Sequence, residues 1–303
     1  MIPAHDRIHS DYNRGLVRPV RWAHALWSRT GGVPWRWAGG GRAWWARPLI
    51  IGLATGAAFV PFDGAIAAFM RNFQEGGRWR IGGDARLIIN TVQQFGDLAT
   101  SLLIAWAILL LDRNKARRFL DWAFAAGLTL LALNVLKLLL GRPRPRFAEP
   151  LGFIGPWGTH AVELGAGESA SIHAWEFWKH GAAQLWSMPS SHTSAAFATA
   201  VVLARLYPAL RPMVFTLAGF VGLARVLVGA HYPSDVVVGA TIALVVAGGC
   251  MDTRLGQRIV SRGRPPIDAP SPPDRAGALR GPGSPGWRAS RASADPARGS
   301  PRR

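Results

Sequence analysis

Residues 119–146 read FLDWAFAAGLTLLALNVLKLLLGRPRPR, in which the first 22 residues contain only two charged side chains, Asp121 and Lys137. A bilayer core of about 30 Å requires roughly 20 mostly apolar residues in a helix, so we expect a membrane span over 119–140. A helix is expected because backbone groups in lipid must satisfy their own hydrogen bonds. The arginine-rich end of this stretch places positive charge at one end of the span.

Five further apolar runs resemble this one, at residues 48–70, 97–111, 193–206, 213–229 and 236–251. The sequence therefore predicts an all-α fold, a six-helix transmembrane bundle. Short runs of this kind also occur as buried helices of soluble α-proteins. Six of them within about 200 residues leave too little polar surface to face water, which favours the membrane.

The two ends of the chain carry most of its charge. Residues 1–47 have a net charge of +6 and residues 252–303 a net charge of +7, out of +18 in total. A soluble nucleic-acid-binding domain is therefore a poor explanation of the basic composition. We expect three regions: a basic, Trp-rich segment at 1–47, a membrane domain at 48–251, and a disordered Pro/Gly/Ser/Arg tail at 252–303. The first segment suits either an interfacial arm on anionic headgroups or a solvated arm.

The distribution of basic residues also predicts the topology. Six spans put both termini on one side, together with the short basic loops 112–118 and 205–211. By the positive-inside rule the termini are cytoplasmic and the long segment 141–188 is extracytoplasmic, as in a multi-pass protein of an inner membrane. No short apolar run follows the first residues, which argues against a cleaved signal peptide. The single Cys250 excludes an intramolecular disulfide.

Polar residues that are costly in membrane helices gather at three helix ends. Lys137 and Arg144 lie at the end of the third span, the sequence MPSSH at 188–192 opens the fourth, and ARVLVGAHYPSD at 224–235 joins the fifth and sixth. In an alternating bundle these three positions face the same side. Ionisable groups such as Lys137 and Arg225 within apolar helices indicate function.

Two chemistries are compatible with these residues. His192, His231 and Asp235 form a 2-His-1-carboxylate set that could hold iron or zinc. Lys137, Arg144 and Arg225 would repel such a cation and suit a phosphate dianion instead, so we expect no metal. Two adjacent serines, Ser190 and Ser191, precede a helix whose N-terminal N–H groups favour negative charge. The two histidines could supply a nucleophile and an acid.

The same residues resemble the signature of the type-2 phosphatidic acid phosphatase superfamily, which includes lipid phosphatases and vanadium haloperoxidases. Its three parts are K-x6-R-P, P-S-G-H and S-R-x5-H-x3-D. Residues 137–145 match the first part in full. Residues 189–192 match the second with Ser191 in place of Gly, and residues 224–235 match the third with Ala224 in place of Ser.

The resemblance implies a role for each matching residue. His231 would attack phosphorus and form a phosphohistidine, and Asp235 would hold the other ring nitrogen of His231. His192 would protonate the leaving group and then activate the water that hydrolyses the intermediate. The phosphoryl oxygens would be bound by Lys137, Arg144, Arg225, Ser190 and Ser191.

The predicted function is therefore that of a lipid phosphate phosphatase that needs no metal or other cofactor. It would act on membrane lipids at the extracytoplasmic ends of spans three to six. The aromatic sequences LGFIGPW and AWEFWKHG in the long segment suit a lid or an entrance for lipid chains, or interfacial anchors. The alternatives are a vanadate-dependent haloperoxidase, a lipid phosphotransferase, and a non-catalytic protein that binds phosphorylated lipids or forms part of a transporter.

Other polar residues have more ordinary expected roles. We expect headgroup or loop contacts for Arg142 and Arg146, and partnerships with nearby arginines for Asp63 and Asp97. The remaining histidines of the long segment, His160, His173 and His180, are expected to be loop residues.

Overall fold

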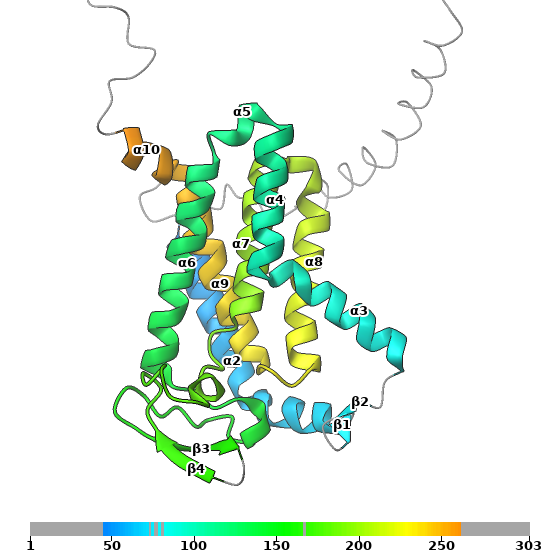
Figure 1. Cartoon of the computed structure of the whole chain (residues 1–303), viewed down its shortest axis with the longest axis vertical. Coiled ribbons are helices and arrows are strands. Elements are labelled where there is room, and N and C mark those ends of the chain that lie inside the picture. Colours follow the sequence, from blue (N-terminus) through cyan, green and yellow to red (C-terminus); the bar gives the residue numbers. More distant parts are fainter. Residues whose placement is uncertain (1–44, 73, 76–77, 80–81, 166–167, 262–303) are drawn as a thin grey trace, which may run out of the picture. The chain divides into compact units, whose positions relative to one another are not determined.

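The computed structural model describes residues 45–72, 74–75, 78–79, 82–165 and 168–261 (Figure 1). The Trp-rich segment up to residue 44 and the tail from residue 262 lie outside the described residues, so the expectations for them stay predictions. Within the range 252–303 assigned to the tail, residues 252–261 are described: Asp252 and Thr253 end a long helix, and Leu255–Ser261 form a short one.

Six longer helices correspond to the six apolar runs of the sequence. They are α2 (Ala46–Arg71), α4 (Leu98–Leu111), α6 (Phe119–Leu140), α7 (Ser191–Leu206), α8 (Arg211–Leu227) and α9 (Pro233–Thr253). Shorter helical elements connect or extend them: α3 (Gly83–Gln93), η1 (Gln94–Gly96), α5 (Arg113–Ala116), η2 (Pro145–Phe147), η3 (Ala182–Leu185), η4 (Pro208–Leu210) and α10 (Leu255–Ser261).

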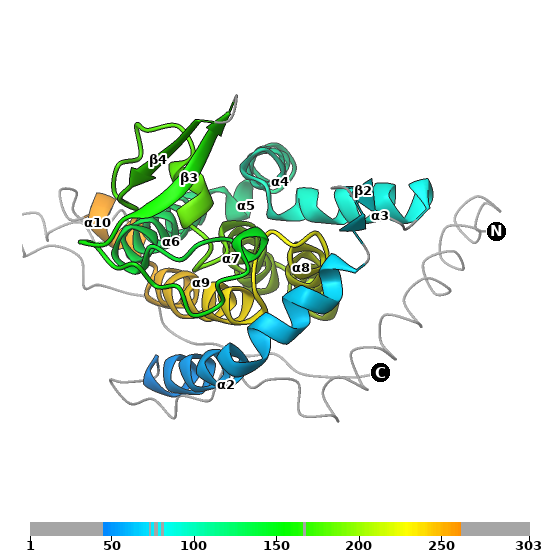
Figure 2. The ribbon, with the colours of Figure 1, turned by 90° about the horizontal axis from the view of Figure 1, so that it is seen from below.

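Helices α7 and α9 form the centre of the bundle. Seen from below, α7 lies among α4, α6, α8 and α9, and α2 packs along the outside of α9 (Figure 2). The sequence of α7 explains its central place, because alanines such as Ala196, Ala200 and Ala204 let neighbouring helices approach closely and are themselves buried. Most of α7 is buried in this way.

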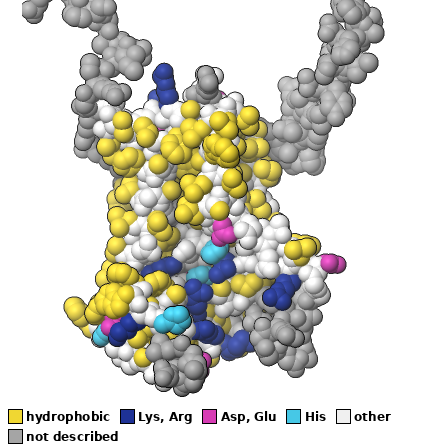
Figure 3. Space-filling view, in the orientation of Figure 1, with side chains coloured by type: hydrophobic (Ala, Val, Ile, Leu, Met, Phe, Trp, Pro, Cys, Tyr) yellow, Lys and Arg dark blue, Asp and Glu magenta, His cyan; other side chains and the backbone are white. Residues whose placement is uncertain are grey.

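The outer helices present large apolar side chains to the surroundings. On α4, for example, Leu103, Trp106 and Leu110 are each about 60% exposed. Hydrophobic side chains cover the upper half of the face in Figure 3, whereas Lys, Arg and His gather in its lower half. Exposed apolar surface of this extent is typical of helices that face lipid.

Four described helices are long and apolar enough to span a membrane: Ala46–Arg71, Asn114–Phe147, Pro208–Leu227 and Pro233–Thr253. A fifth span results if Gly83–Gly96 and Leu98–Leu111, which meet at a 60° bend, are taken together. Helix α7 has only 16 residues, and its burial rather than lipid contact explains its shorter apolar run. The predicted count of six spans is therefore not confirmed.

The two predicted basic loops lie together at one end of the bundle. The hydroxyl of Tyr207 donates to Asp112, and the ammonium of Lys115 lies 4.0 Å from the centre of the Tyr207 ring. The start of the C-terminal region joins them, because Arg205 pairs with Asp252 at 2.7 Å.

The opposite end carries a cap formed by residues 141–188. The prediction of an all-α fold is wrong for this segment, because β3 (His160–Gly165) pairs with β4 (Glu168–Ile172) as an antiparallel hairpin, with His160 opposite Ile172. A second, very short hairpin pairs β1 (Gln74–Glu75) with β2 (Arg78–Trp79). The cap has a small core of its own, made of Val162, Ile172, Ala174, Ala182 and Leu185.

A left-handed glycine directs the chain from α6 into the cap. Gly141 ends α6 with φ +55°, and a Cβ there would lie 3.0 Å from that of Ala174. Only glycine adopts this conformation without strain and leaves that space. The turn at Gly141 sends residues 142–144 back across the end of the bundle.

Candidate active site

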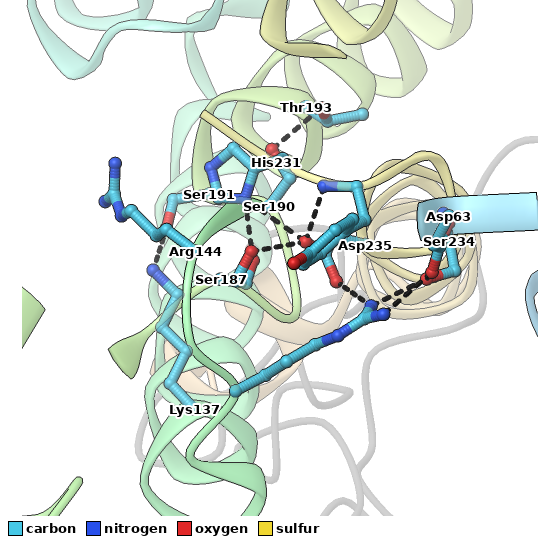
Figure 4. A network of polar contacts seen from close by, with 12 residues as sticks. Asp63, Lys137, Arg144, Ser187, Ser190, Ser191, Thr193, His231, Ser234 and Asp235 are labelled. Atoms are coloured by element: carbon cyan, nitrogen blue, oxygen red, sulfur yellow. Dashed lines mark hydrogen bonds and ion pairs between the residues drawn. The ribbon is translucent and has the colours of Figure 1, made fainter. Parts of the chain in front are cut away.

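The predicted site residues come together at the capped end of the bundle (Figure 4). Lys137 lies in the last turn of α6, Ser191 is the first residue of α7, and Arg225 lies in the last turn of α8. The positive charges of Lys137, Arg144 and Arg225 act on one another, and all three act on the ring of His192. Three remote parts of the sequence therefore form one cationic cluster.

His231 is buried in the turn between α8 and α9, and its protonation follows from its partner. Its Nδ1 lies 2.6 Å from the carbonyl oxygen of Ser187. Because a carbonyl can only accept, Nδ1 carries the proton and Nε2 keeps its lone pair. Burial lowers the pKa of His231 to about 4, although the carboxylate of Asp235 opposes this shift. At neutral pH the ring is therefore neutral, with a nucleophilic Nε2.

Asp235 supports this arrangement through its neighbours. Its Oδ2 accepts hydrogen bonds from the Ser187 hydroxyl at 2.5 Å and from the backbone N–H of Tyr232 at 2.8 Å. The same Oδ2 lies 3.7 Å from Nδ1 of His231, whose closer acceptor is the Ser187 carbonyl. The carboxylate therefore fixes both residues that border the His231 ring, in addition to acting on its charge.

Arg142 ties this carboxylate to helix α2. Its guanidinium is fully buried and pairs with Asp235 Oδ1 at 2.6 Å and with Asp63 Oδ2 at 2.8 Å. Asp63 in turn accepts from the backbone N–H of Ser234 at 3.1 Å. The expected loop contact of Arg142 exists, through the carbonyl oxygen of Pro150, but complete burial rules out a headgroup contact. The expected arginine partner of Asp63 is confirmed.

The start of α7 presents its first turn to the cationic cluster. Ser190 precedes the helix, and its side chain does not cap it but accepts a hydrogen bond from the Thr193 hydroxyl at 3.0 Å. Lys137 donates to the hydroxyl of Ser191, the residue that replaces the glycine of the motif. The side chain of Ser191 therefore occupies one of the three donors of Lys137.

The two arginines of the cluster are each held by a neighbouring group. Arg225 donates to the Oε1 of Gln93 on α3 at 2.6 Å, and its buried Nε has no partner among the described residues. The Nε of Arg144 donates to the carbonyl oxygen of Ala183 in the cap at 3.1 Å. Gln93 therefore orients Arg225, and the cap orients Arg144. The sequence predicted both arginines but not the groups that hold them.

His192, the second residue of α7, pairs with a carboxylate from the second apolar run. Its Nε2 lies 2.9 Å from Oδ1 of Asp97. The ion pair of Asp97 is therefore with a histidine and not with the expected arginine, although its charge also acts on Arg225. The cap histidines His160 and His173 make contacts within the cap, to Glu149 and to the Gly158 carbonyl oxygen. The described residues contain no group of three His, Cys, Asp or Glu side chains arranged to hold a metal ion.

Comparison with known proteins identifies related sequences. Residues 118–258 match the family model described as the PAP2 superfamily. Two relatives named lipid A 1-phosphatase, from Rhizobium johnstonii and Rhizobium etli, are each 30% identical over 163 residues, which covers 48% of this chain. The matches cover 58% and 61% of those proteins, so the chain spans about three fifths of the length of these curated relatives.

Two solved structures are also similar to this chain. One is a transmembrane PAP2-type phosphatidylglycerolphosphate phosphatase from Bacillus subtilis, with a TM-score of 0.47, 17% identity and coverage of 73% of this chain and 98% of that one. The other is LpxE from Aquifex aeolicus, with a TM-score of 0.41, 18% identity and coverage of 61% and 93%.

Proposed function

We propose that the protein is an integral-membrane phosphatase of lipid phosphates, on the premise that residues 118–258, which match the PAP2 superfamily model, share the chemistry of that family. It cleaves a phosphomonoester or diphosphate through a phosphohistidine and without a metal ion. The observation that carries this proposal is the neutral, buried His231, whose Nε2 keeps its lone pair beside the cluster of Lys137, Arg144 and Arg225.

In the first step Nε2 of His231 attacks phosphorus, and the bond from phosphorus to the lipid oxygen breaks. Protonated His192 gives its proton to that oxygen, so the lipid leaves as an alcohol or as a shorter phosphate. The phosphorylated ring of His231 becomes cationic, and the nearby carboxylate of Asp235 stabilises it. Nδ1 keeps its proton throughout and donates it in a hydrogen bond to the Ser187 carbonyl oxygen.

In the second step water replaces His231 on phosphorus. Neutral His192 takes a proton from the water as it attacks, the bond between Nε2 and phosphorus breaks, and inorganic phosphate is released. His231 returns to its neutral form and His192 is again protonated. Phosphoryl transfer depends mainly on positioning and charge stabilisation, which three cations and the first turn of α7 supply without a metal.

The substrate that the comparisons favour is a lipid A phosphate, because both curated relatives are named lipid A 1-phosphatase. Phosphatidic acid, phosphatidylglycerol phosphate and prenyl diphosphates are the other candidates. Trp157, Phe177 and Trp178 on the cap are 88%, 66% and 62% exposed, which suits contact with lipid chains near the site.

We place the protein in an inner membrane with cytoplasmic termini and an extracytoplasmic active site. The basic loops around Lys115 and Arg205 support this orientation, since they lie at the end of the bundle opposite the cap. The proposed membrane domain is residues 48–251, flanked by the basic segment 1–47 and the tail 252–303.

The test is phosphate release by the purified protein in detergent with EDTA present, over a panel of lipid monophosphates and diphosphates. We expect release from at least one lipid, and loss of at least 10³-fold in kcat in His231→Ala, because no nucleophile remains. His180→Ala is the matched control, since His180 is an exposed histidine of the cap. Brief reaction with ³²P-labelled substrate should give an acid-labile label on His231.

Several outcomes would contradict the proposal. Activity that is lost with EDTA and restored by a divalent metal would exclude the metal-independent mechanism. Full activity in His231→Ala would exclude the nucleophile. Label that passes to an added lipid alcohol instead of water would indicate a phosphotransferase, and halide oxidation upon addition of vanadate would indicate a haloperoxidase.

A further inference from the structure

The carboxylate of Asp97 has an unusual partner for its position. Asp97 is the N-cap residue of α4, where an Asp side chain normally accepts from the backbone N–H groups of its own helix. Here the side chain makes no such capping bond, and its Oδ1 lies 2.9 Å from Nε2 of His192 on α7. A local hydrogen bond is therefore replaced by a contact between helices.

The bend between α3 and α4 brings Asp97 close to His192. The element η1 separates the two helices at an angle of 60° and packs against the start of α7. A Cβ at Gly96 would lie 2.5 Å from the carbonyl oxygen of His192, so glycine is required for this approach. One turn earlier, Gln93 accepts from the guanidinium of Arg225 at 2.6 Å. The bend thus contacts Arg225 of the cationic cluster and the adjacent His192.

The charges around His192 give the contact its significance. Burial is the largest of the effects that lower the pKa of His192, and the positive charges of Arg225, Lys137 and Arg144 lower it further. The carboxylate of Asp97 acts in the opposite direction and raises it. A general acid must hold a proton before it can donate it, and a neighbouring carboxylate favours the protonated form.

We propose that Asp97 is a positioning residue for His192: it binds Nε2, favours the protonated ring among three cations, and leaves Nδ1 to protonate the leaving group. This inference rests on the phosphatase function proposed above. It adds to the site a residue from the second apolar run, outside the matched region 118–258.

The diagnostic experiment compares two leaving groups in Asp97→Asn. A lipid alkoxide is a poor leaving group and needs the proton of His192, whereas p-nitrophenolate departs without protonation. We expect kcat/KM, which reports the steps up to the phosphohistidine and not its hydrolysis, to fall by about 10²-fold on the lipid phosphate and to change by less than about 3-fold on p-nitrophenyl phosphate. The alkaline limb of the pH profile on the lipid should move to lower pH, because the ring loses its proton more easily.

Two further variants separate positioning from folding. Asp97→Glu should recover much of the lipid activity, and Asp84→Asn, which alters an exposed carboxylate at the start of α3, should leave both activities unchanged. In a double-mutant cycle, Asp97→Asn should add little to His192→Ala if Asp97 acts through that ring. The cycle remains informative if Asp97→Asn is less stable, since instability would lower activity in both backgrounds.

The results distinguish the two proposals. Equal losses on both substrates, an unshifted pH profile, or full additivity with His192→Ala would overturn the role of Asp97 while the phosphatase function stands. Absence of phosphate release by the wild-type protein from every lipid would instead overturn the proposed function itself.

Discussion

The reactivity of His231 depends on a backbone group as much as on a side chain. The carbonyl of Ser187 determines which ring nitrogen carries the proton, and Asp235 holds the hydroxyl of the same serine. A substitution at Ser187 would remove the hydroxyl but keep the carbonyl. The orientation of the His231 ring is therefore less sensitive to mutation than it would be if a side chain held it.

The burial of His231 has a measurable effect on stability. An unfolded histidine has an ordinary pKa near 6.5, whereas the folded value is about 4. As pH falls between these values the unfolded state gains a proton that the folded state does not, so the free energy of unfolding decreases by roughly 3 kcal/mol. This contribution is fully present above pH 6.5 and is lost by about pH 4.

We predict that the thermal midpoint of the wild-type protein falls more steeply from pH 7 to pH 4.5 than that of His231→Asn, measured by tryptophan fluorescence in detergent. His180→Asn should follow the wild-type curve. Parallel curves for the wild type and His231→Asn would contradict a buried neutral histidine.

At the scale of elements, a buried ionic network joins three segments that are remote in sequence. Asp63 on α2, Arg142 after α6 and Asp235 on α9 share one guanidinium, and all three side chains are fully buried. Helix α2 therefore does more than face lipid, because its carboxylate completes the support of the active-site turn. Removing Asp63 would still leave Arg142 paired with Asp235, but the Arg142 Nη2 and the buried N–H of Ser234 would each lose an acceptor.

We predict that Asp63→Ala lowers the free energy of unfolding by about 1–3 kcal/mol, because two buried donors lose their acceptor, and also reduces kcat, because Arg142 then holds Asp235 less firmly. Thermal unfolding and phosphate release in the same detergent test this expectation. Asp84→Ala, at an exposed carboxylate, should change neither. Unchanged stability in Asp63→Ala would show that the network tolerates the loss.

The sequence predicted the helices and the cationic cluster because both leave local signals. Apolar runs mark helices, and the spacing from Lys137 to Arg144 or from His231 to Asp235 is preserved within one segment. The pairings of Asp63 with Arg142 and Asp97 with His192 join segments that are far apart in sequence, so no local pattern identifies the partner. Ser187 acts partly through its backbone carbonyl, and because every residue has a carbonyl, the residue type does not reveal this role. The β-hairpin of the cap lay within a segment expected only as a lid or loop.

At the scale of the whole molecule, the two ends of the bundle differ in chemistry. One end has short basic loops, and the other has the cap and the proposed active site. The side of the membrane that each end faces can be tested by labelling introduced cysteines. The only native cysteine, Cys250, is buried within α9 and should not react.

We predict that a membrane-impermeant maleimide labels His180→Cys in intact cells and labels Asn114→Cys only after permeabilisation. Both positions are exposed, one on the cap and one on α5. The wild-type protein should remain unlabelled in both conditions. The reverse pattern would place the cap and the active site in the cytoplasm.

The hydroxyl that Ser191 offers to Lys137 has a consequence for the end of each turnover. In the proposed reaction a phosphoryl oxygen that binds Lys137 displaces this hydroxyl. When phosphate leaves, the ammonium of Lys137 can donate to Ser191 again. We expect phosphate to leave this protein more readily than it leaves a variant with glycine at position 191, in which Lys137 would have no hydroxyl to donate to. In the proposed reaction, Ser191 would therefore weaken the retention of phosphate and speed its release.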